Sequence, residues 1–215
     1  MTTTRNILLA LTLAGGVAVA GTAGAEPVKL SAKQTALTAA HFQAKTQIID
    51  DPLDIETVIS SEQGYRAGQG LLKSPASDNH LRAFVDKRSG ATRFEVRQTV
   101  MYPGAIRGYS QVSHQTATWP VEAPLTKIRD NAGQCFFFEA PEVCREEVSF
   151  SVSEAELRSA AGKPGAWAYK LTSPKGYEHR TAITNAEIEG LLKVVDTYRR
   201  ALPAAQAAAD TASGS

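Results

Sequence analysis

The amino-acid sequence predicts an α+β fold, built mainly from hairpins of an antiparallel sheet. Short runs alternate apolar and polar residues between turns rich in Gly or Pro, which is typical of half-buried strands. One late segment repeats apolar residues at helical spacing. Strands follow one another in runs, whereas a parallel sheet would alternate strand and helix. We therefore expect a short helix near 153–161 and a C-terminal amphipathic helix near 185–200, packed on the sheet.

The first 25 residues have the three regions of a secretory signal peptide. Arg5 precedes an apolar run at 7–13, and a Gly/Ala-rich stretch ends in Ala23-Gly24-Ala25. We expect cleavage after Ala25 and a soluble protein in the periplasm or outside the cell. The alternative is an uncleaved membrane anchor, but spanning needs about 20 strongly apolar residues and glycines dilute the second half of this segment.

The remaining chain predicts one globular α+β domain at 26–202, followed by a disordered tail at 203–215 that lacks bulky apolar residues. Loss of Arg5 leaves 22 basic and 22 acidic residues. Capture of nucleic acid wants a basic excess or a clustered basic face, so we expect no nucleic-acid partner. No later apolar run is long enough to cross a bilayer, so we expect no integral membrane segment after cleavage.

The start of the domain carries two competing patterns. Residues 41–48 alternate like a strand, and 53–59 resume the alternation after Asp50-Asp51-Pro52, which predicts a hairpin. Ser31 with Gln34 forms a capping box, which favours a helix over 31–40. Residues 62–79 have three glycines and little periodicity and are interpreted as a long connection.

The clearest hairpin joins 80–85 to 92–100, with Gly90 available for positive φ in the turn. A third strand at about 106–117 would complete an antiparallel meander. Pro120 and Pro124 then open a loop that leads to the cysteine region.

The second half of the chain has stronger boundary signals. Residues 146–152 alternate as a strand, Ser153 with Glu156 caps a short helix, and Gly162-Lys163-Pro164 ends it. Residues 166–171 and 177–183 form another hairpin. Thr184 with Glu187 opens the last helix, which we expect to end at Pro203. Its apolar face has Ile188, Leu191, Leu192 and Val195, while Glu187, Glu189, Lys193 and Arg199 fall elsewhere.

Cys135 and Cys144 are the only cysteines. In an oxidising compartment an isolated pair is most simply a disulfide, which would stabilise a loop of this size by roughly 2.5 to 3 kcal/mol. Redox catalysis favours Cys-x-x-Cys, and a zinc site needs more ligands than two cysteines provide.

No motif assigns a catalytic residue, a metal or a cofactor. The chain has no nucleophile elbow, and the glycine-rich stretch 64–70 lacks the residues of a phosphate-binding loop. The four histidines, His41, His80, His114 and His179, are far apart in sequence and have no metal-ligand spacing.

One candidate ligand site follows from the first hairpin. Alternation places His80, Arg82 and Phe84 on one face of the first strand, and Arg93, Glu95 and Arg97 on one face of the second. Cross-strand pairing could bring the two sets side by side. Arg82, Arg93 and Arg97 could then hold a carboxylate or phosphate. The alternative is a solvated sheet face on which Glu95 and Asp86 balance the arginines.

Two functional hypotheses remain from the sequence. The first is a non-catalytic binding or accessory protein of the envelope, whose partner is another envelope protein or a small anionic ligand. The second is a periplasmic hydrolase that uses a His and a carboxylate distant in sequence. A concave pocket with a His beside a buried carboxylate would favour the enzyme, and a flat apolar patch with a polar rim would favour the binder. A structural component would show stable self-association.

Overall fold

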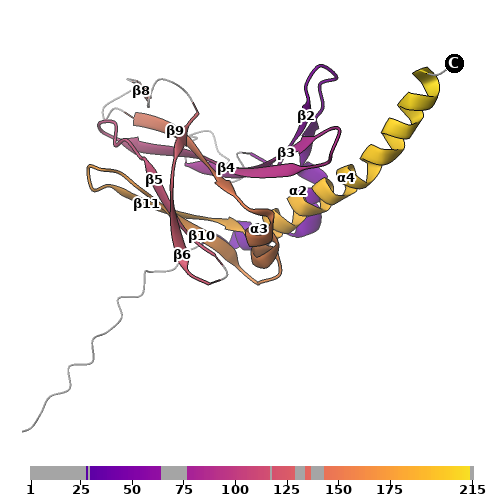
Figure 1. Ribbon diagram of the computed structural model, residues 1–215. Helices are drawn as coiled ribbons and strands as arrows, with labels where there is room; N and C mark the ends of the chain where they lie inside the picture. Colours follow the sequence, from indigo (N-terminus) through magenta and orange to yellow (C-terminus); the bar gives the residue numbers. More distant parts are fainter. Residues whose placement is uncertain are drawn as a thin grey trace, which may run out of the picture.

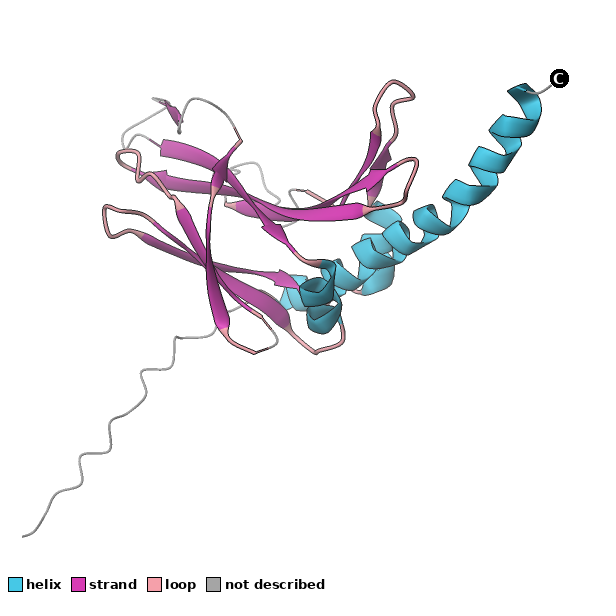
Figure 2. Cartoon of the chain, in the orientation of Figure 1, coloured by secondary structure: helices cyan, strands magenta, loops and turns pink. Residues whose placement is uncertain are grey.

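The computed structural model describes residues 28, 30–63, 77–116, 118–128, 134–136 and 143–213. Side chains are described up to Leu202, and within 134–136 only for Cys135. Two antiparallel sheets and accompanying helices confirm the α+β class (Figure 2). The expected signal peptide and its cleavage after Ala25 lie outside the described residues, and the domain boundaries remain a prediction.

The larger sheet has the strand order β1-β2-β3-β4-β9-β7, and β8 also pairs with β9. Its strands are β1 (Gln47–Ile49), β2 (Glu56–Ser60), β3 (Asp78–Asp86), β4 (Thr92–Pro103), β7 (Thr126–Lys127), β8 (Gln134–Phe136) and β9 (Val143–Val152). The smaller sheet has the order β11-β10-β5-β6. Its strands are β5 (Gln111–Gln115), β6 (Pro120–Pro124), β10 (Ala166–Thr172) and β11 (Glu178–Thr184).

The two sheets face each other and share one core (Figure 1). Alternate residues of β4 are buried between them, as the period of a strand requires. The Phe150 ring of β9 lies 5.2 Å from the Tyr169 ring of β10. The Tyr169 hydroxyl donates a 2.6 Å hydrogen bond to the buried Gln98 side chain of β4, so polar as well as apolar contacts join the layers.

The helices gather at one end of this sandwich (Figure 1). They are α1 (Ala32–Thr35), α2 (Ala39–Lys45), α3 (Glu154–Ala161) and α4 (Asn185–Ser213). The helix α4 packs against α2, α3 and strands of both sheets. Its predicted apolar face is confirmed, because Ile188, Leu191, Leu192 and Val195 are all buried.

Most predictions that rest on short-range patterns are confirmed. The hairpins β3-β4 and β10-β11 form, with Gly90 at φ +70° and Gly176 at φ +82° in their turns. Capping boxes start α1 at Ser31 and α3 at Ser153, and Gly162 caps the end of α3.

The prediction of a strand over 41–48 is wrong for its first part. Residues 39–45 form α2, because Thr38 caps the helix by accepting from the His41 backbone amide, and Phe42 is buried against α4. Only 47–49 form a strand, which pairs with β2, so the expected hairpin exists in shortened form. Helical and strand patterns are hard to separate when a segment buries a single large residue.

The expected three-stranded meander is also wrong. β5 pairs with β6 and β10 in the smaller sheet. The strand that pairs with β4 on the side away from β3 is β9. The segment with Pro120 and Pro124 is the strand β6 and not only a loop. β6 lies at a sheet edge, where a missing backbone N–H leaves no hydrogen bond unmade.

Two predictions about the last helix need correction. α4 continues past Pro203 to Ser213, consistent with the high helix propensity of its alanines at 204–209. Glu187, expected away from the apolar face, is fully buried, because its carboxylate accepts a 2.6 Å hydrogen bond from the Ser61 hydroxyl. The assignment of 203–215 to a separate tail remains a prediction.

The predicted disulfide joins Cys135 and Cys144. The two residues lie opposite each other in β8 and β9. The bond therefore links the short strand β8 to β9, which forms the longest pairing of the larger sheet with β4.

A buried carboxylate anchors the loop between the two sheets. Glu146 of β9 accepts hydrogen bonds of 3.0 to 3.1 Å from the backbone amides of Arg107, Gly108 and Tyr109. The Tyr102 hydroxyl also donates to it. Burial, followed by this bond, raises the pKa of Tyr102, so the hydroxyl stays a donor. Gly108 has φ +73°, which lets consecutive amides converge on the carboxylate.

Replacement of Glu146 by Gln should destabilise the fold by about 3 kcal/mol. The amide loses the charge that strengthens these bonds and directs an NH₂ group at N–H donors. Urea unfolding measures the change. Glu147→Gln is the matched control, since this half-buried neighbour lies on the other face of β9, pairs with Arg145, and should change stability by only about 1 kcal/mol. Equal effects of the two variants would contradict this role of Glu146.

Replacement of Gly190 by Ala should destabilise the fold by about 2 kcal/mol or more. A Cβ at Gly190 would lie 2.7 Å from Phe42 Cβ and 2.8 Å from the Ala39 carbonyl, so α2 would have to move. Helix propensity alone would favour Ala by about 1 kcal/mol, so the sign distinguishes packing from propensity. Gly162→Ala is the control, because its nearest neighbour would be at 3.8 Å. A Gly190→Ala protein as stable as wild type in urea would exclude the tight contact.

Candidate functional site

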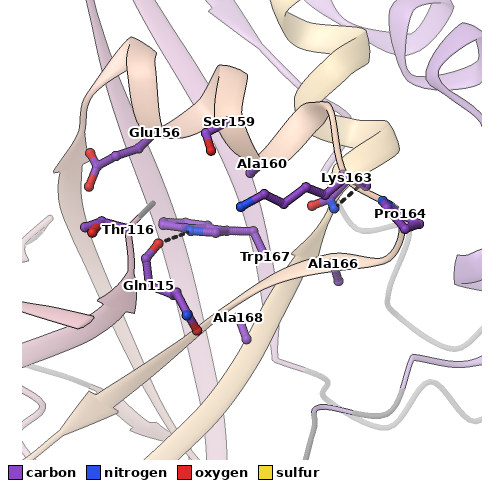
Figure 3. A pocket seen from close by; sticks show the side chains of 11 residues that line it. Gln115, Thr116, Glu156, Ser159, Ala160, Lys163, Pro164, Ala166, Trp167 and Ala168 are labelled. Carbon is purple, nitrogen blue, oxygen red and sulfur yellow. Dashed lines mark hydrogen bonds between the residues drawn. The ribbon is translucent and has the colours of Figure 1, made fainter. Parts of the chain in front are cut away.

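A cavity of about 310 Å³ lies where α3 meets the ends of two strands of the smaller sheet (Figure 3). Its wall comes from β5, α3, the following loop, β10 and the first residue of α4. The lining residues are Gln115, Thr116, Glu156, Ser159, Ala160, Lys163, Pro164, Ala166, Trp167, Ala168 and Asn185.

Asn185 shapes the loop that forms one wall. Its side-chain amide donates a 2.8 Å hydrogen bond to the Lys163 carbonyl, and its backbone N–H donates to the Gly165 carbonyl at 3.0 Å. These bonds hold the loop that follows α3 against the start of α4. The Asn185 side-chain oxygen is buried and has no hydrogen-bond partner among the described residues. One residue of the cavity wall therefore has an acceptor that is buried and unsatisfied.

Lys163 brings a positive charge to the same place. Its side chain extends from the loop toward the Trp167 ring, as Figure 3 shows. Among the described residues no carboxylate lies within ion-pair distance of its ammonium. The cavity thus has a cationic donor available for an anionic group.

Trp167 supplies the apolar surface of the cavity. The indole is largely buried, and its N–H donates a 2.8 Å hydrogen bond to the Gln115 carbonyl. This bond fixes the ring plane, because the donor cannot rotate away without losing a partner. The aromatic wall is therefore rigid before any ligand binds.

His114 and Glu156 form a His/carboxylate pair beside the cavity. Their Nε2 and Oε1 atoms are 3.3 Å apart. Only Glu156 lines the cavity. The His114 side chain is 4% exposed and packs between the Phe150 and Trp167 rings, at 5.7 and 5.3 Å. Its Nδ1 atom has no partner among the described residues, so no nucleophile is positioned by it.

The Glu156 carboxylate also completes the capping box of α3. Burial alone would raise the pKa of Glu156, but hydrogen bonds from Ser153 and from His114 outweigh it and lower that pKa. A carboxylate held in its charged form by three bonds is a weak base and a poor proton donor near neutral pH. The pair is therefore better suited to holding α3 against β5 than to transferring a proton.

The other histidines occupy separate surroundings. His41 bonds Glu62 at 2.7 Å, and His80 lies opposite Arg97 in the β3-β4 pair. Burial, together with the nearby Arg107, lowers the pKa of His179 to about 4. No group of three or more His, Cys, Asp or Glu side chains suited to a metal occurs in the part of the chain that the structure describes.

The predicted arginine site is partly assembled. Arg82 and Arg93 both lie over the Phe84 ring, at 5.0 and 3.5 Å, on the outer face of the larger sheet. Arg93 pairs with Glu56 and Arg97 pairs with Glu95, each within 2.8 Å. Two of the three predicted ligands therefore already have carboxylate partners, as the solvated-face alternative expects. Anion binding by Arg82, Arg93 and Arg97 remains a prediction.

Sequence reasoning missed the residues that define the cavity. The sequence pattern at Gly162-Lys163-Pro164 predicted only the end of a helix. Asn185 stood beside the predicted cap of α4, so neither segment indicated a ligand. The paired-residue pattern of β5 and β10 could have placed Gln115 near Trp167, but only after β5 was assigned to the smaller sheet.

The low pKa of His179 predicts a specific pH dependence. The unfolded side chain titrates near 6.5 and the folded one near 4, so between these values the unfolded state binds more protons. The contribution of this pKa shift to the free energy of unfolding is therefore fully present above pH 6.5. Up to about 3 kcal/mol of it is lost as the pH falls to 4. His179→Gln should flatten this part of the curve in urea unfolding from pH 7 to 4.5.

Glu178→Gln is the control for that experiment. Hydrogen bonds from Lys170 and Arg180 lower the pKa of this exposed carboxyl from 4.5, so it stays charged across the same window. Its replacement should leave the slope between pH 7 and about 5.5 unchanged, because a carboxyl that titrates below 4.5 binds few protons there in either state. An unchanged slope in His179→Gln would instead show that another group causes the dependence.

Comparison with known proteins adds no relationship to this geometry. No protein family model matches the chain, and no curated protein sequence or solved structure matches it.

Proposed function

We propose that the protein is a non-catalytic binding protein of the cell envelope that holds a small anionic ligand in the cavity between α3 and β10. The observation that carries this proposal is the meeting of two unused polar groups at one wall. The Lys163 ammonium has no ion pair, and the buried Asn185 oxygen has no donor, among the described residues.

Each group suits one part of a ligand. A buried acceptor without a partner destabilises the protein by about 1 to 3 kcal/mol, and a ligand N–H or O–H would remove that penalty. The Lys163 ammonium would pair with a carboxylate or phosphate, and Trp167 would contact a short apolar part. About 310 Å³ is at the lower end of small-molecule sites. A hydroxy acid or an amino acid has this combination of groups.

The proposed location rests on three features. Residues 1–25 have the pattern of a signal peptide. Cys135 and Cys144 form a disulfide, which persists in oxidising compartments. No helix among the described residues is long and apolar enough to cross a membrane. Mass spectrometry of the exported chain tests the location, since cleavage after Ala25 gives Glu26 as the first residue.

A second candidate, a hydrolase, is favoured by one observation. His114 and Glu156 form the His/carboxylate pair that the sequence left open, and Glu156 lines a concave cavity. The near-complete burial of His114 and the lowered pKa of Glu156 favour the binding role over this one.

Tryptophan fluorescence tests the binding role. The chain has two tryptophans, and Trp119→Phe removes the exposed one, leaving Trp167 as the reporter in the cavity wall. Acetate, lactate, succinate, glycine and inorganic phosphate are the probes, at millimolar concentrations. We expect at least one to change the Trp167 emission in a saturable way and to raise the melting temperature.

Variants of Lys163 assign the response to the cavity. Lys163→Met should weaken binding of the responding probe about tenfold or more, and Lys163→Arg should restore part of it. Lys193→Met is the matched control, because Lys193 lies on the exposed side of α4. No saturable response to any probe, or equal affinity of Lys163→Met and wild type, would overturn the proposal.

A further inference from the structure

The cavity between α3 and β10 has a negative group as well as a positive one. Glu156 and Lys163 are the charged residues that line it, and the Glu156 side chain is 21% exposed. Burial raises the pKa of the Glu156 carboxyl, but hydrogen bonds from Ser153 and His114 lower it by more, so the group is charged at neutral pH. A wall with one carboxylate and one ammonium is best matched by a ligand that carries both signs of charge.

The two charged groups do not neutralise each other. In the part of the chain that the structure describes, no ion pair joins Glu156 to Lys163. Ser159 and Ala160 lie between them in the sequence and line the same wall. Figure 3 shows the two charged ends at separate positions, with the Lys163 side chain directed toward the Trp167 ring. Opposite charges held apart along one wall leave space for a ligand that bridges them.

The Glu156 carboxylate can accept a further hydrogen bond. Its Oε2 atom accepts from the Ser153 amide at 2.8 Å and from the Ser153 hydroxyl at 2.6 Å. Its Oε1 atom contacts His114 Nε2 at 3.3 Å. A carboxylate has about four acceptor positions, so Oε1 can also accept from a ligand. An ammonium group is charged and has three N–H donors, so it binds this oxygen more strongly than a neutral hydroxyl does.

From this arrangement we propose that the ligand is a small amino acid in its zwitterionic form. This inference rests on the proposed binding role of the cavity. The ligand's carboxylate pairs with Lys163, its ammonium donates to Glu156, and its side chain contacts Trp167. The site therefore selects amino acids over hydroxy acids of the same shape, because a hydroxy acid leaves the charge of Glu156 without a cationic partner.

Paired ligands test this selectivity in the Trp119→Phe protein, with Trp167 fluorescence as the readout. L-Alanine and L-lactate differ only in an ammonium against a hydroxyl, and glycine and glycolate form a second such pair. We expect at least one amino acid to bind about tenfold or more tightly than its hydroxy acid. Ethylamine, which lacks the carboxylate of alanine, should bind more weakly than alanine, because Lys163 then has no partner.

Variants of α3 assign the selectivity to Glu156. Glu156→Gln should bring the affinities for the amino acid and its hydroxy acid to within about threefold of each other, because the amide keeps the capping box but loses the charge. Glu154→Gln is the matched control, since Glu154 pairs with Arg158 and Arg199 and does not line the cavity. It should keep the wild-type ratio of affinities. Urea unfolding verifies that each variant folds.

The outcomes separate this inference from the proposed function. Hydroxy acids that bind as tightly as their amino acids would overturn the amino-acid ligand and leave the binding role standing. Ethylamine binding as tightly as alanine, or a wild-type ratio in a folded Glu156→Gln protein, would also overturn it. If Glu156→Gln does not fold, the ligand pairs on the unaltered cavity decide. The absence of a saturable response to every probe would overturn both proposals.

Discussion

The buried carboxylate of Glu146 fixes the point where the chain leaves one sheet and enters the other. After β4 ends at Pro103, the loop must turn back so that β5 can join the smaller sheet. The Gly108 and Tyr109 amides donate to Glu146 alone, and the Arg107 amide donates to Glu146 and to the Tyr102 hydroxyl, so without Glu146 two of these amides would lose their acceptor. Burying a carboxylate is unfavourable unless several donors surround it, and here backbone amides and Tyr102 do so. Carboxylate and loop therefore depend on each other.

The candidate site depends on this crossover. β5 carries His114 and Gln115, and it reaches the cavity only because the loop places it beside β10. The Gln115 carbonyl holds the indole of Trp167, and His114 packs between that ring and Phe150. The His/carboxylate pair then docks α3, whose following loop brings Lys163 and Asn185 together. On this account His114 and Glu156 position the wall of a binding site.

Local signals in the sequence were reliable where short-range contacts decide the structure. The capping boxes at Ser31 and Ser153 and the turn at Gly90 involve neighbours within four residues, so their patterns transfer directly to structure. Predictions from the sequence were wrong where a contact between residues distant in the chain determines the structure. Phe42 becomes helical with Gly190 of α4 as its neighbour, and Glu187 is buried by Ser61. Lys163 and Asn185 are 22 residues apart and meet only in the folded chain.

Amide hydrogen exchange at Arg107, Gly108 and Tyr109 tests the central claim most directly. If Glu146 holds the crossover, these three loop amides should exchange as slowly as amides in the centre of β4 and β9, because both would need global unfolding to open. Exchange at the rate of an exposed turn, such as that at Lys175 and Gly176, would show that the loop opens independently. The buried carboxylate would then not be the contact that joins the two sheets.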